Sequence, residues 1–178
     1  MRLFVAVWPS EEIVARIAAL PRPAAPGLRW TTRDQWHVTL RFLGDAELAP
    51  VVAALQAATL PPTRPVTAGP AVDRFGPRVL VLPVSGLDPL AAATVAATAG
   101  LGSHPPDERP FAGHVTLARV NTSGRRGPNR GPDLRSFAGA PLGGSWEVRE
   151  VTVVESRLGR AGARYEVRAR VPLPPPRE

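Results

Sequence analysis

The tetrapeptide His-Val-Thr-Leu occurs twice in this chain, in "HVTLRFLGD" at residues 37–45 and in "HVTLARV" at residues 114–120. These two copies contain two of the three histidines of the sequence. Both stretches are rich in β-branched residues, which is typical of β-strands. Because side chains alternate along a strand, each copy presents its histidine and threonine on one face and its valine and leucine on the other. The repeat therefore predicts two similar units, each of which brings one histidine and one threonine hydroxyl to a shared cleft.

The segments around the two copies alternate between strand and helix patterns. Ser10 is a typical N-cap, Asp88 with Pro89 is expected to cap a later helix, and Gly76 with Pro77 marks a turn between two apolar runs. Hairpins and short connections argue against an all-parallel sheet, so we predict an α+β fold with two similar lobes in a single domain over residues 1–178. The expected strands lie at about residues 2–8, 35–44, 65–75, 78–86, 111–120, 145–158 and 163–173, and the expected helices at about 11–20, 49–60 and 88–99.

The composition is that of a globular chain that could bind anions. With 178 residues, of which 44% are hydrophobic, it can form one domain with a core. The net charge is +7 and lysine is absent, so every basic residue is an arginine, the side chain that binds phosphate in a bidentate manner. A coding bias toward arginine, alanine, proline and glycine would give the same excess, so the charge permits a polyanionic partner without requiring one.

Two absences narrow the function classes. The sequence has no cysteine, which excludes thiolate metal sites and cysteine nucleophiles and fits a reducing compartment. No apolar run reaches the length of a membrane span. We therefore expect a cytoplasmic protein with no membrane partner.

Two histidines in one cleft can perform acid–base catalysis. With an ordinary pKa near ~6.5, one imidazole can accept a proton while the other, protonated, donates one. The threonine hydroxyls can hold phosphate oxygens, and an arginine can balance the developing negative charge. This arrangement suits a phosphodiester, above all a strained cyclic one. Two histidines without a neighbouring carboxylate or cysteine make a poor metal site, so we expect neither metal nor cofactor. His104 lacks the motif and is expected at the surface.

Four ordered stretches of the sequence resemble the bacterial RNA 2′,3′-cyclic phosphodiesterases of the 2H phosphoesterase superfamily, also described as 2′-5′ RNA ligases or LigT-like proteins. The stretches are "RLFVAVWP", "WHVTLRFLGD", "RPFAGHVTLAR" and "ESRLGRAGARYEV". One departure is Gly113, where the family often has proline before the second histidine. The resemblance implies a bilobal fold of two pseudo-symmetric lobes of antiparallel sheet, with helices on the outside and a central cleft.

The resemblance also implies an activity, which is metal-independent hydrolysis of a terminal 2′,3′-cyclic phosphate on RNA to a 2′-phosphate. His37 would be the proton donor to the leaving 3′ oxygen, and His114 the proton acceptor that activates water. Thr39 and Thr116 would bind phosphate oxygens. The motif itself is symmetric, and the reverse reaction, 2′-5′ RNA ligation, would exchange the two roles. RNA ends such as those of tRNA halves would be the substrates of a monomeric enzyme.

Further side chains are candidates for substrate contact. Arg41 keeps the strand parity of the first histidine, whereas Arg119 is off by one and reaches the cleft only if a bulge redirects it. An exposed arginine on a strand is also common without any ligand. Phe4 and Tyr165 are candidates for stacking on a base, with a core position as the alternative. Phe42 falls on the apolar face and is expected in the core.

Other interpretations of the sequence stay open. In the glycine-, proline- and arginine-rich segment 121–133, Arg125, Arg126 and Arg130 could steer RNA by charge or could simply be solvated. One rival function is an RNA- or nucleotide-binding module without turnover, against which the retention of both histidines and both threonines argues. Another is a related enzyme acting on a small cyclic nucleotide or a nucleotide-sugar cyclic phosphate. The basic charge and the length of the resemblance favour RNA ends.

Overall fold

The computed structural model describes residues 1–121 and 132–178, and in this part of the chain ten strands form one sheet with three helices packed against it. The candidate arginines Arg125, Arg126 and Arg130 lie outside the described residues. The strands are β1 (Arg2–Val7), β2 (Leu28–Trp30), β3 (Val38–Asp45), β4 (Arg64–Ala68), β5 (Asp73–Phe75), β6 (Val79–Ser85), β7 (His114–Val120), β8 (Gly144–Val148), β9 (Glu150–Gly159) and β10 (Gly162–Pro172). The helices are α1 (Glu11–Ala18), α2 (Leu48–Ala57) and α3 (Asp88–Ala97), with short 3₁₀ turns η1 (Arg33–Gln35) and η2 (Leu134–Ser136).

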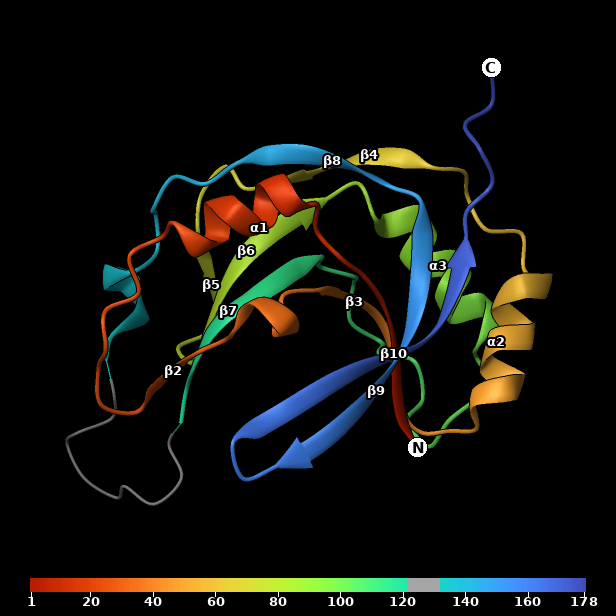
Figure 1. The fold of residues 1–178 in the computed structure, drawn as a ribbon, viewed down its shortest axis with the longest axis horizontal. Coiled ribbons are helices and arrows are strands. Elements are labelled where there is room, and N and C mark those ends of the chain that lie inside the picture. The colour runs from red at the N-terminus through yellow and green to blue at the C-terminus, as the bar shows by residue number, and fades with distance from the viewer. Residues whose placement is uncertain (122–131) are drawn as a thin grey trace.

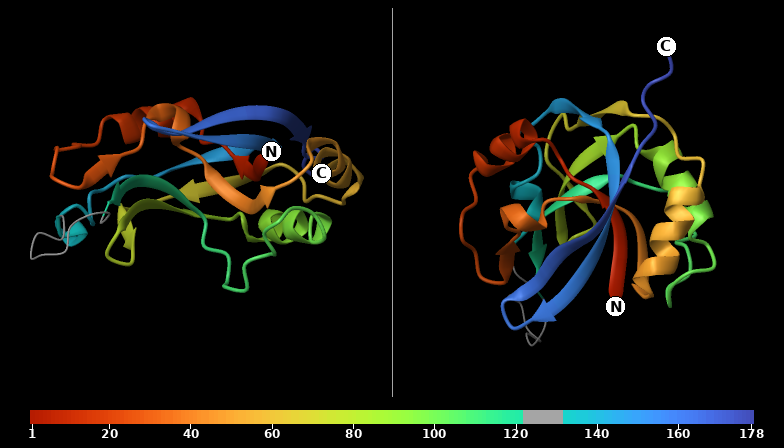
Figure 2. Two further views of the ribbon diagram at one scale, coloured as in Figure 1. Left: turned by 90° about the horizontal axis from the view of Figure 1, so that it is seen from below. Right: turned by 45° about the vertical axis from the view of Figure 1, so that its right-hand side comes forward.

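The sheet consists of two halves that meet where β3 pairs with β7. Its strand order is β10-β9-β1-β3-β7-β6-β4-β8, with β2 beside β7 and β5 beside β6. Neighbouring strands run antiparallel. The sheet curves strongly, so that the strands of the first half lie above those of the second when the molecule is seen from below (Figure 2, left). The predicted α+β fold with two lobes of antiparallel sheet is confirmed.

The helices lie outside the curved sheet and connect its two halves (Figure 1). Helix α1 follows β1 of the first half but packs on β8 of the second, whereas α3 follows β6 of the second half and packs on β3 of the first. Helix α2 contacts β9, β10 and α3. Because each of α1 and α3 covers the half that it does not follow in sequence, the two halves are packed together by both helices.

Local signals in the sequence explain the first elements. Strand β1 is buried from Leu3 onward, which accounts for its apolar sequence. The hydroxyl of Ser10 accepts a hydrogen bond from the backbone N–H of Ile13 at 3.4 Å and caps α1, as predicted. Ile13, Val14 and Ile17 form the buried face of this helix.

The structure departs from the expected strands at three places. The expected strand 65–75 is divided into β4 and β5 because Gly69, at a φ of +89°, and Pro70, which has no N–H, interrupt the ladder. The expected strand 145–158 is divided at Arg149, where β8 leaves the second half and β9 joins the first. The short strand β2 was not predicted.

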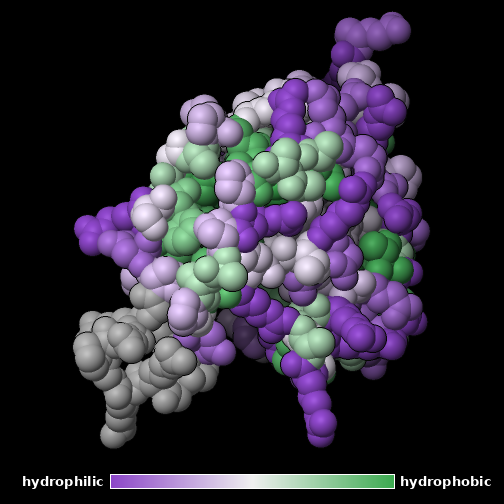
Figure 3. Space-filling view, turned by 60° about the vertical axis from the view of Figure 1, so that its left-hand side comes forward, coloured by the Kyte–Doolittle hydropathy of each residue, from purple (hydrophilic) through white to green (hydrophobic). Residues whose placement is uncertain are grey.

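Most buried apolar side chains belong to one core that extends under both halves. A smaller apolar cluster, made by Phe4, Ala6 and Val154, lies on the opposite face of β1 and β9, toward the cavity described below. On the face shown in Figure 3, charged and polar side chains surround several small apolar groups. Within the described residues, no helix combines the length and apolar character that a membrane span needs.

Candidate active site

The two His-Val-Thr-Leu copies come together at the junction of the halves. The valines of the two copies pair with each other across β3 and β7. In this antiparallel register, His37 comes opposite Thr116 and Thr39 comes opposite His114. All four polar side chains lie on the face away from the buried valines and line one cavity of about 420 Å³.

A β-bulge after the first copy decides which later side chains reach this cavity. The register of β3 against β1 skips Leu40, which reverses the alternation of side chains beyond it. Arg41 therefore turns into the interior, where it is 4% exposed and donates hydrogen bonds to the carbonyl groups of Phe42, His104 and Pro105 at 2.7, 2.6 and 2.9 Å. The prediction that Arg41 shares the cleft face was wrong. Phe42, expected in the core, lines the cavity instead.

The second copy is followed by the same kind of bulge. The register of β7 against β6 skips Leu117, so Ala118 is turned into the core and Arg119 lines the cavity. The condition under which the sequence placed Arg119 in the cleft is thus met. Arg119 follows its histidine by the same number of residues as Phe42 follows His37, and both side chains line the cavity. The repeat therefore extends through the bulge, but the first half contributes an aromatic side chain at this position and the second half a cationic one.

His37 is held in an aromatic and mostly buried environment. Its Nδ1 lies 2.8 Å from the carbonyl oxygen of Gln35, and its Nε2 lies 3.1 Å from the hydroxyl of Thr39. The rings of Phe4, Trp8 and Tyr165 have their centroids 4.8, 5.4 and 5.0 Å from that of His37. Burial lowers the pKa of His37 to about 4. The hydrogen bond to the Gln35 carbonyl opposes this shift, and the positive charges of His114 and Arg119 add to it.

His114 has a matching but more open environment. Its Nδ1 lies 2.8 Å from the carbonyl oxygen of Ala112, and the ring of Phe75 packs edge-on with its centroid 4.4 Å away. Burial lowers the pKa of His114, the carbonyl of Ala112 opposes this, and the charge of Arg119 lowers it further. Because a carbonyl oxygen can only accept, each histidine carries a proton on Nδ1. Each Nε2 is therefore the atom that accepts or donates the proton in chemistry.

A hydrogen-bonded chain connects the first copy to the second. The indole N–H of Trp36, the residue before His37, donates to the hydroxyl of Thr31 at 3.0 Å. That hydroxyl lies 2.8 and 2.9 Å from the carbonyl oxygens of Thr116 and Leu117, and the backbone N–H of Thr31 donates to the latter at 2.9 Å. Thr31 therefore satisfies the carbonyl groups at the bulge of β7. No pattern in the sequence marked Thr31.

Three arginines give the cavity a positive character. Arg2, Arg29 and Arg119 line it, and its described lining includes no aspartate or glutamate. The guanidinium of Arg2 lies 4.9 Å from the ring centroid of Phe42, and that of Arg29 donates to the carbonyl of Ala161 in the β9–β10 hairpin. The described lining consists of Arg2, Phe4, Arg29, Trp30, Thr31, Gln35, His37, Thr39, Phe42, His114, Thr116, Arg119, Ser156, Leu158, Ala163 and Tyr165.

Among the described residues, every site residue expected from the sequence except Arg41 therefore lies at this cavity. Phe4 is 4% exposed and packs edge-on against Tyr165, with the ring centroids 5.2 Å apart, so Tyr165 is the more accessible of the two aromatic candidates. His104, expected at the surface, is exposed. Among the described residues, no three histidine, cysteine or acidic side chains gather in a group that could hold a metal ion.

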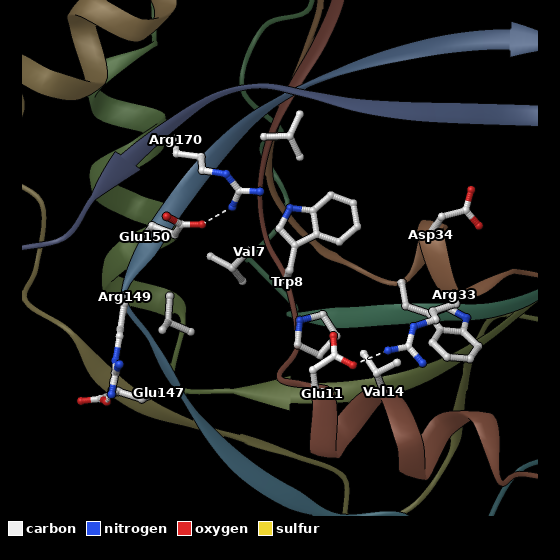
Figure 4. Close-up of a pocket in the computed structure, with 14 residues that line it drawn as sticks. Val7, Trp8, Glu11, Val14, Arg33, Asp34, Glu147, Arg149, Glu150 and Arg170 are labelled. Atoms are coloured by element: carbon white, nitrogen blue, oxygen red, sulfur yellow. Dashed lines mark hydrogen bonds and ion pairs between the residues drawn. The ribbon is translucent and has the colours of Figure 1, made fainter.

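A second cavity, of about 800 Å³, has a different chemistry (Figure 4). Trp8 separates it from the first cavity, since the indole ring both lines it and contacts His37. Its three arginines are each paired with a carboxylate, and Asp34 adds a further negative charge. The pairs are Arg33 with Glu11, Arg149 with Glu147, and Arg170 with Glu150. The carboxylates that line the second cavity offset its arginines, whereas no carboxylate of the described lining neutralises the arginines of the first cavity. The first cavity is therefore the better site for an anion.

Comparisons with known proteins place the sequence in one family. A sequence model of the 2′-5′ RNA ligase superfamily matches residues 9–160. The chain is 28% identical over 174 residues to an RNA 2′,3′-cyclic phosphodiesterase of Geobacillus stearothermophilus, a match that covers 92% of this chain and 54% of that protein. The chain thus spans about half the length of this curated relative.

Solved structures resemble the fold over its whole length. Protein TT0787 of Thermus thermophilus superimposes with a TM-score of 0.75 at 27% identity, covering 98% of this chain and 99% of that one. The LigT protein of E. coli complexed with 3′-AMP superimposes with a TM-score of 0.69 at 26% identity, covering 97% of each chain. These matches confirm the LigT-like 2H phosphoesterase fold that the sequence resemblance implied.

Proposed function

The chain belongs to the 2′-5′ RNA ligase superfamily, and from that premise we propose that it hydrolyses the 2′,3′-cyclic phosphate at an RNA end to a 2′-phosphate without a metal ion. The observation that carries this proposal is the matched pair of histidines, each with Nδ1 on a backbone carbonyl and each beside a threonine at one arginine-lined cavity. The 28% identical RNA 2′,3′-cyclic phosphodiesterase supports the same reaction class.

In the proposed reaction, the phosphate lies between the two Nε2 atoms. The Nε2 of His114 accepts a proton from water, whose oxygen forms the new bond to phosphorus. The bond from phosphorus to O3′ breaks, and the Nε2 of His37 donates its proton to O3′. The hydroxyls of Thr39 and Thr116 donate to non-bridging oxygens, and Arg119 offsets the charge that develops on them.

Under this assignment His37 takes up its proton from solvent when the substrate binds. In the free chain burial holds the pKa of His37 at about 4, so its ring is neutral near pH ~7. An anionic phosphate beside the ring raises that pKa because it stabilises the imidazolium. An imidazolium in so apolar an environment releases its proton readily, and this suits a donor to the leaving oxygen.

A substrate with sulfur in place of O3′ tests the two roles. A thiolate leaves without being protonated, so the variant that lacks the proton donor should regain activity on the sulfur substrate, while the variant that lacks the acceptor should not. We expect recovery in His37→Ala and none in His114→Ala. Recovery confined to His114→Ala would reverse the assignment.

RNA is the proposed substrate, and the arginines of the cavity support it. Arg2 and Arg29 extend the positive lining beyond the phosphate position, and Tyr165 and Phe42 offer aromatic surface to the terminal base. Phe4, which is almost fully buried, would act by supporting the rings of Tyr165 and His37. We further propose RNA ends such as those of tRNA halves as substrates, and a cytoplasmic monomer as the enzyme.

Comparison of two substrates tests the RNA assignment. A short RNA with a 2′,3′-cyclic phosphate should have a higher kcat/KM than the corresponding mononucleotide, and the advantage should decrease with salt because phosphate contacts release counterions. Equal kcat/KM for both would favour a small cyclic nucleotide as the substrate. Binding of both without turnover would favour a binding module.

A further inference from the structure

An exposed phenylalanine lies against the second histidine, outside the lining of the cavity. Phe75, in the edge strand β5, is 39% exposed, and its ring centroid is 4.4 Å from that of His114. In the described part of the chain, the exposed large apolar side chains are Met1, Phe75 and Leu158. Leu158 lines the cavity. An exposed aromatic ring beside a nucleotide site offers a surface on which a base can stack.

Strand register places Phe75 on the cavity side of the sheet. Phe75 pairs with Val79 of β6, and Val79 pairs with Arg119 of β7, so these three side chains form one row on the same face. The neighbouring row runs from Asp73 through β6 to Thr116, the threonine of the second motif. The row that begins with Phe75 therefore ends at the arginine of the cavity, beside the row that contains a phosphate-binding threonine.

The two histidines differ in what surrounds them. Three aromatic rings enclose His37, whereas the single exposed ring of Phe75 contacts His114. The enclosed side belongs to the cavity that would hold the nucleoside of the cyclic phosphate. The side of Phe75 adjoins the histidine that would activate the nucleophile.

We propose that Phe75 is the stacking platform of a second nucleoside subsite, which binds the nucleoside whose 5′-hydroxyl replaces water as the nucleophile. This inference rests on the phosphodiesterase function proposed above. The Nε2 of His114 accepts the proton of the 5′-hydroxyl, and O5′ forms the bond to phosphorus. The bond from phosphorus to O3′ breaks, O3′ takes the proton of His37, and a 2′-5′ phosphodiester results. The histidines keep the roles proposed for hydrolysis, and the exchange of roles expected for ligation does not apply in this direction, because O3′ is the leaving atom in both reactions. The carboxylate of Asp73, on the same face, can accept hydrogen bonds from ribose hydroxyls or a base amine.

The test is a competition between water and an alcohol for one cyclic phosphate. Cytidine 2′,3′-cyclic phosphate is incubated with the enzyme and increasing concentrations of the dinucleotide ApA, which has a free 5′-hydroxyl. The ratio of 2′-5′-linked product to 2′-phosphate is measured for wild type, Phe75→Leu and Phe75→Tyr. This ratio does not depend on the amount of folded enzyme or on steps that both reactions share. Glycerol, an alcohol without a base, serves as the control acceptor.

We expect the ratio for ApA to saturate in wild type and in Phe75→Tyr, which keeps the aromatic ring. In Phe75→Leu the ratio at subsaturating ApA should fall about tenfold, since stacking of one base on an aromatic ring contributes on this order. The ratio for glycerol should be the same in all three proteins. Hydrolysis without saturable transfer to ApA in wild type, or an unchanged ratio in Phe75→Leu, would overturn the inference and leave the proposed function standing. Absence of hydrolysis as well would overturn the proposed function itself.

Discussion

Replacement of Arg119 by glutamine removes the one cavity arginine whose charge acts on both histidines. The bulge at Leu117 brings the guanidinium to the cavity, and its positive charge lowers the pKa of His37 and of His114. Glutamine keeps a polar side chain at this exposed position but carries no charge. Arg119→Gln should therefore raise the pKa of both histidines and weaken the hold on phosphate.

The size of the effect depends on the lost hydrogen bond. A hydrogen bond to a charged group contributes about 1.5–3 kcal/mol, and about 1.4 kcal/mol corresponds to a factor of ten. The kcat/KM for a 2′,3′-cyclic phosphate should accordingly fall about 10- to 100-fold at the wild-type pH optimum. Both limbs of the profile of kcat/KM against pH should move to higher pH, because the removed cation had opposed protonation of the two rings.

The assay is the full pH profile of kcat/KM for wild type, Arg119→Gln and a matched control, Arg2→Gln. Arg2 lines the same cavity, but its charge does not contribute to the pKa shift of either histidine. The control should weaken binding without moving the limbs. An unshifted profile in Arg119→Gln, or an equal shift in both variants, would refute this account of Arg119.

Three further predictions concern the site and its supports. Thr31→Val should lower kcat while the free energy of unfolding changes little, because the hydroxyl links Trp36 to the bulge of β7, and Thr31→Ser should restore kcat. Kinetics and denaturant titrations of the same variants measure the two effects, and a loss of kcat that only parallels a loss of stability would contradict this role. Arg41→Met should destabilise the fold by about 1–3 kcal/mol, since it removes the hydrogen bonds that the buried guanidinium donates to three backbone carbonyl groups; a wild-type unfolding midpoint would contradict this. The unfolded state protonates His37 near pH ~6.5 but the folded state only near about 4, so stability should decrease as the pH is lowered between these values by about 1.4 kcal/mol per pH unit, at most about 3 kcal/mol in all; this part of the decrease should be lost in His37→Gln, whereas the part that the lowered pKa of His114 contributes should remain.

The sequence was sufficient for the motif and insufficient for the residues just beyond it. Alternation within His-Val-Thr-Leu correctly placed both histidines and threonines on one face. The same rule failed at Arg41 and Phe42 because a bulge depends on how β3 registers against β1, and that register is a property of two strands rather than one. For Arg119 the sequence could state the condition, a bulge, but could not show that it is met.

Other parts of the site depend on tertiary packing. Thr31 and Arg29 reach the cavity from segments with no recognisable motif, and Arg2 begins a stretch that showed only the family resemblance; the folded chain alone brings all three to the cavity. The division of the expected strand 145–158 did leave a signal in the sequence. The apolar alternation of Trp146 and Val148 changes parity at Val151 and Val153, where the chain passes from one half of the sheet to the other. The cap of the first helix was predicted correctly at Ser10. The predicted cap of the third helix was wrong, because the N-cap of α3 is Leu87 and Asp88 is its first helical residue.

The most direct test of the central claim is hydrolysis of a short RNA ending in a 2′,3′-cyclic phosphate, in the presence of EDTA, by wild type, His37→Ala and His114→Ala. The two-histidine account predicts metal-free turnover to a 2′-phosphate by wild type and its loss in both variants, with far-UV circular dichroism unchanged. Turnover retained in both variants, activity abolished by EDTA, or a 3′-phosphate product would contradict it.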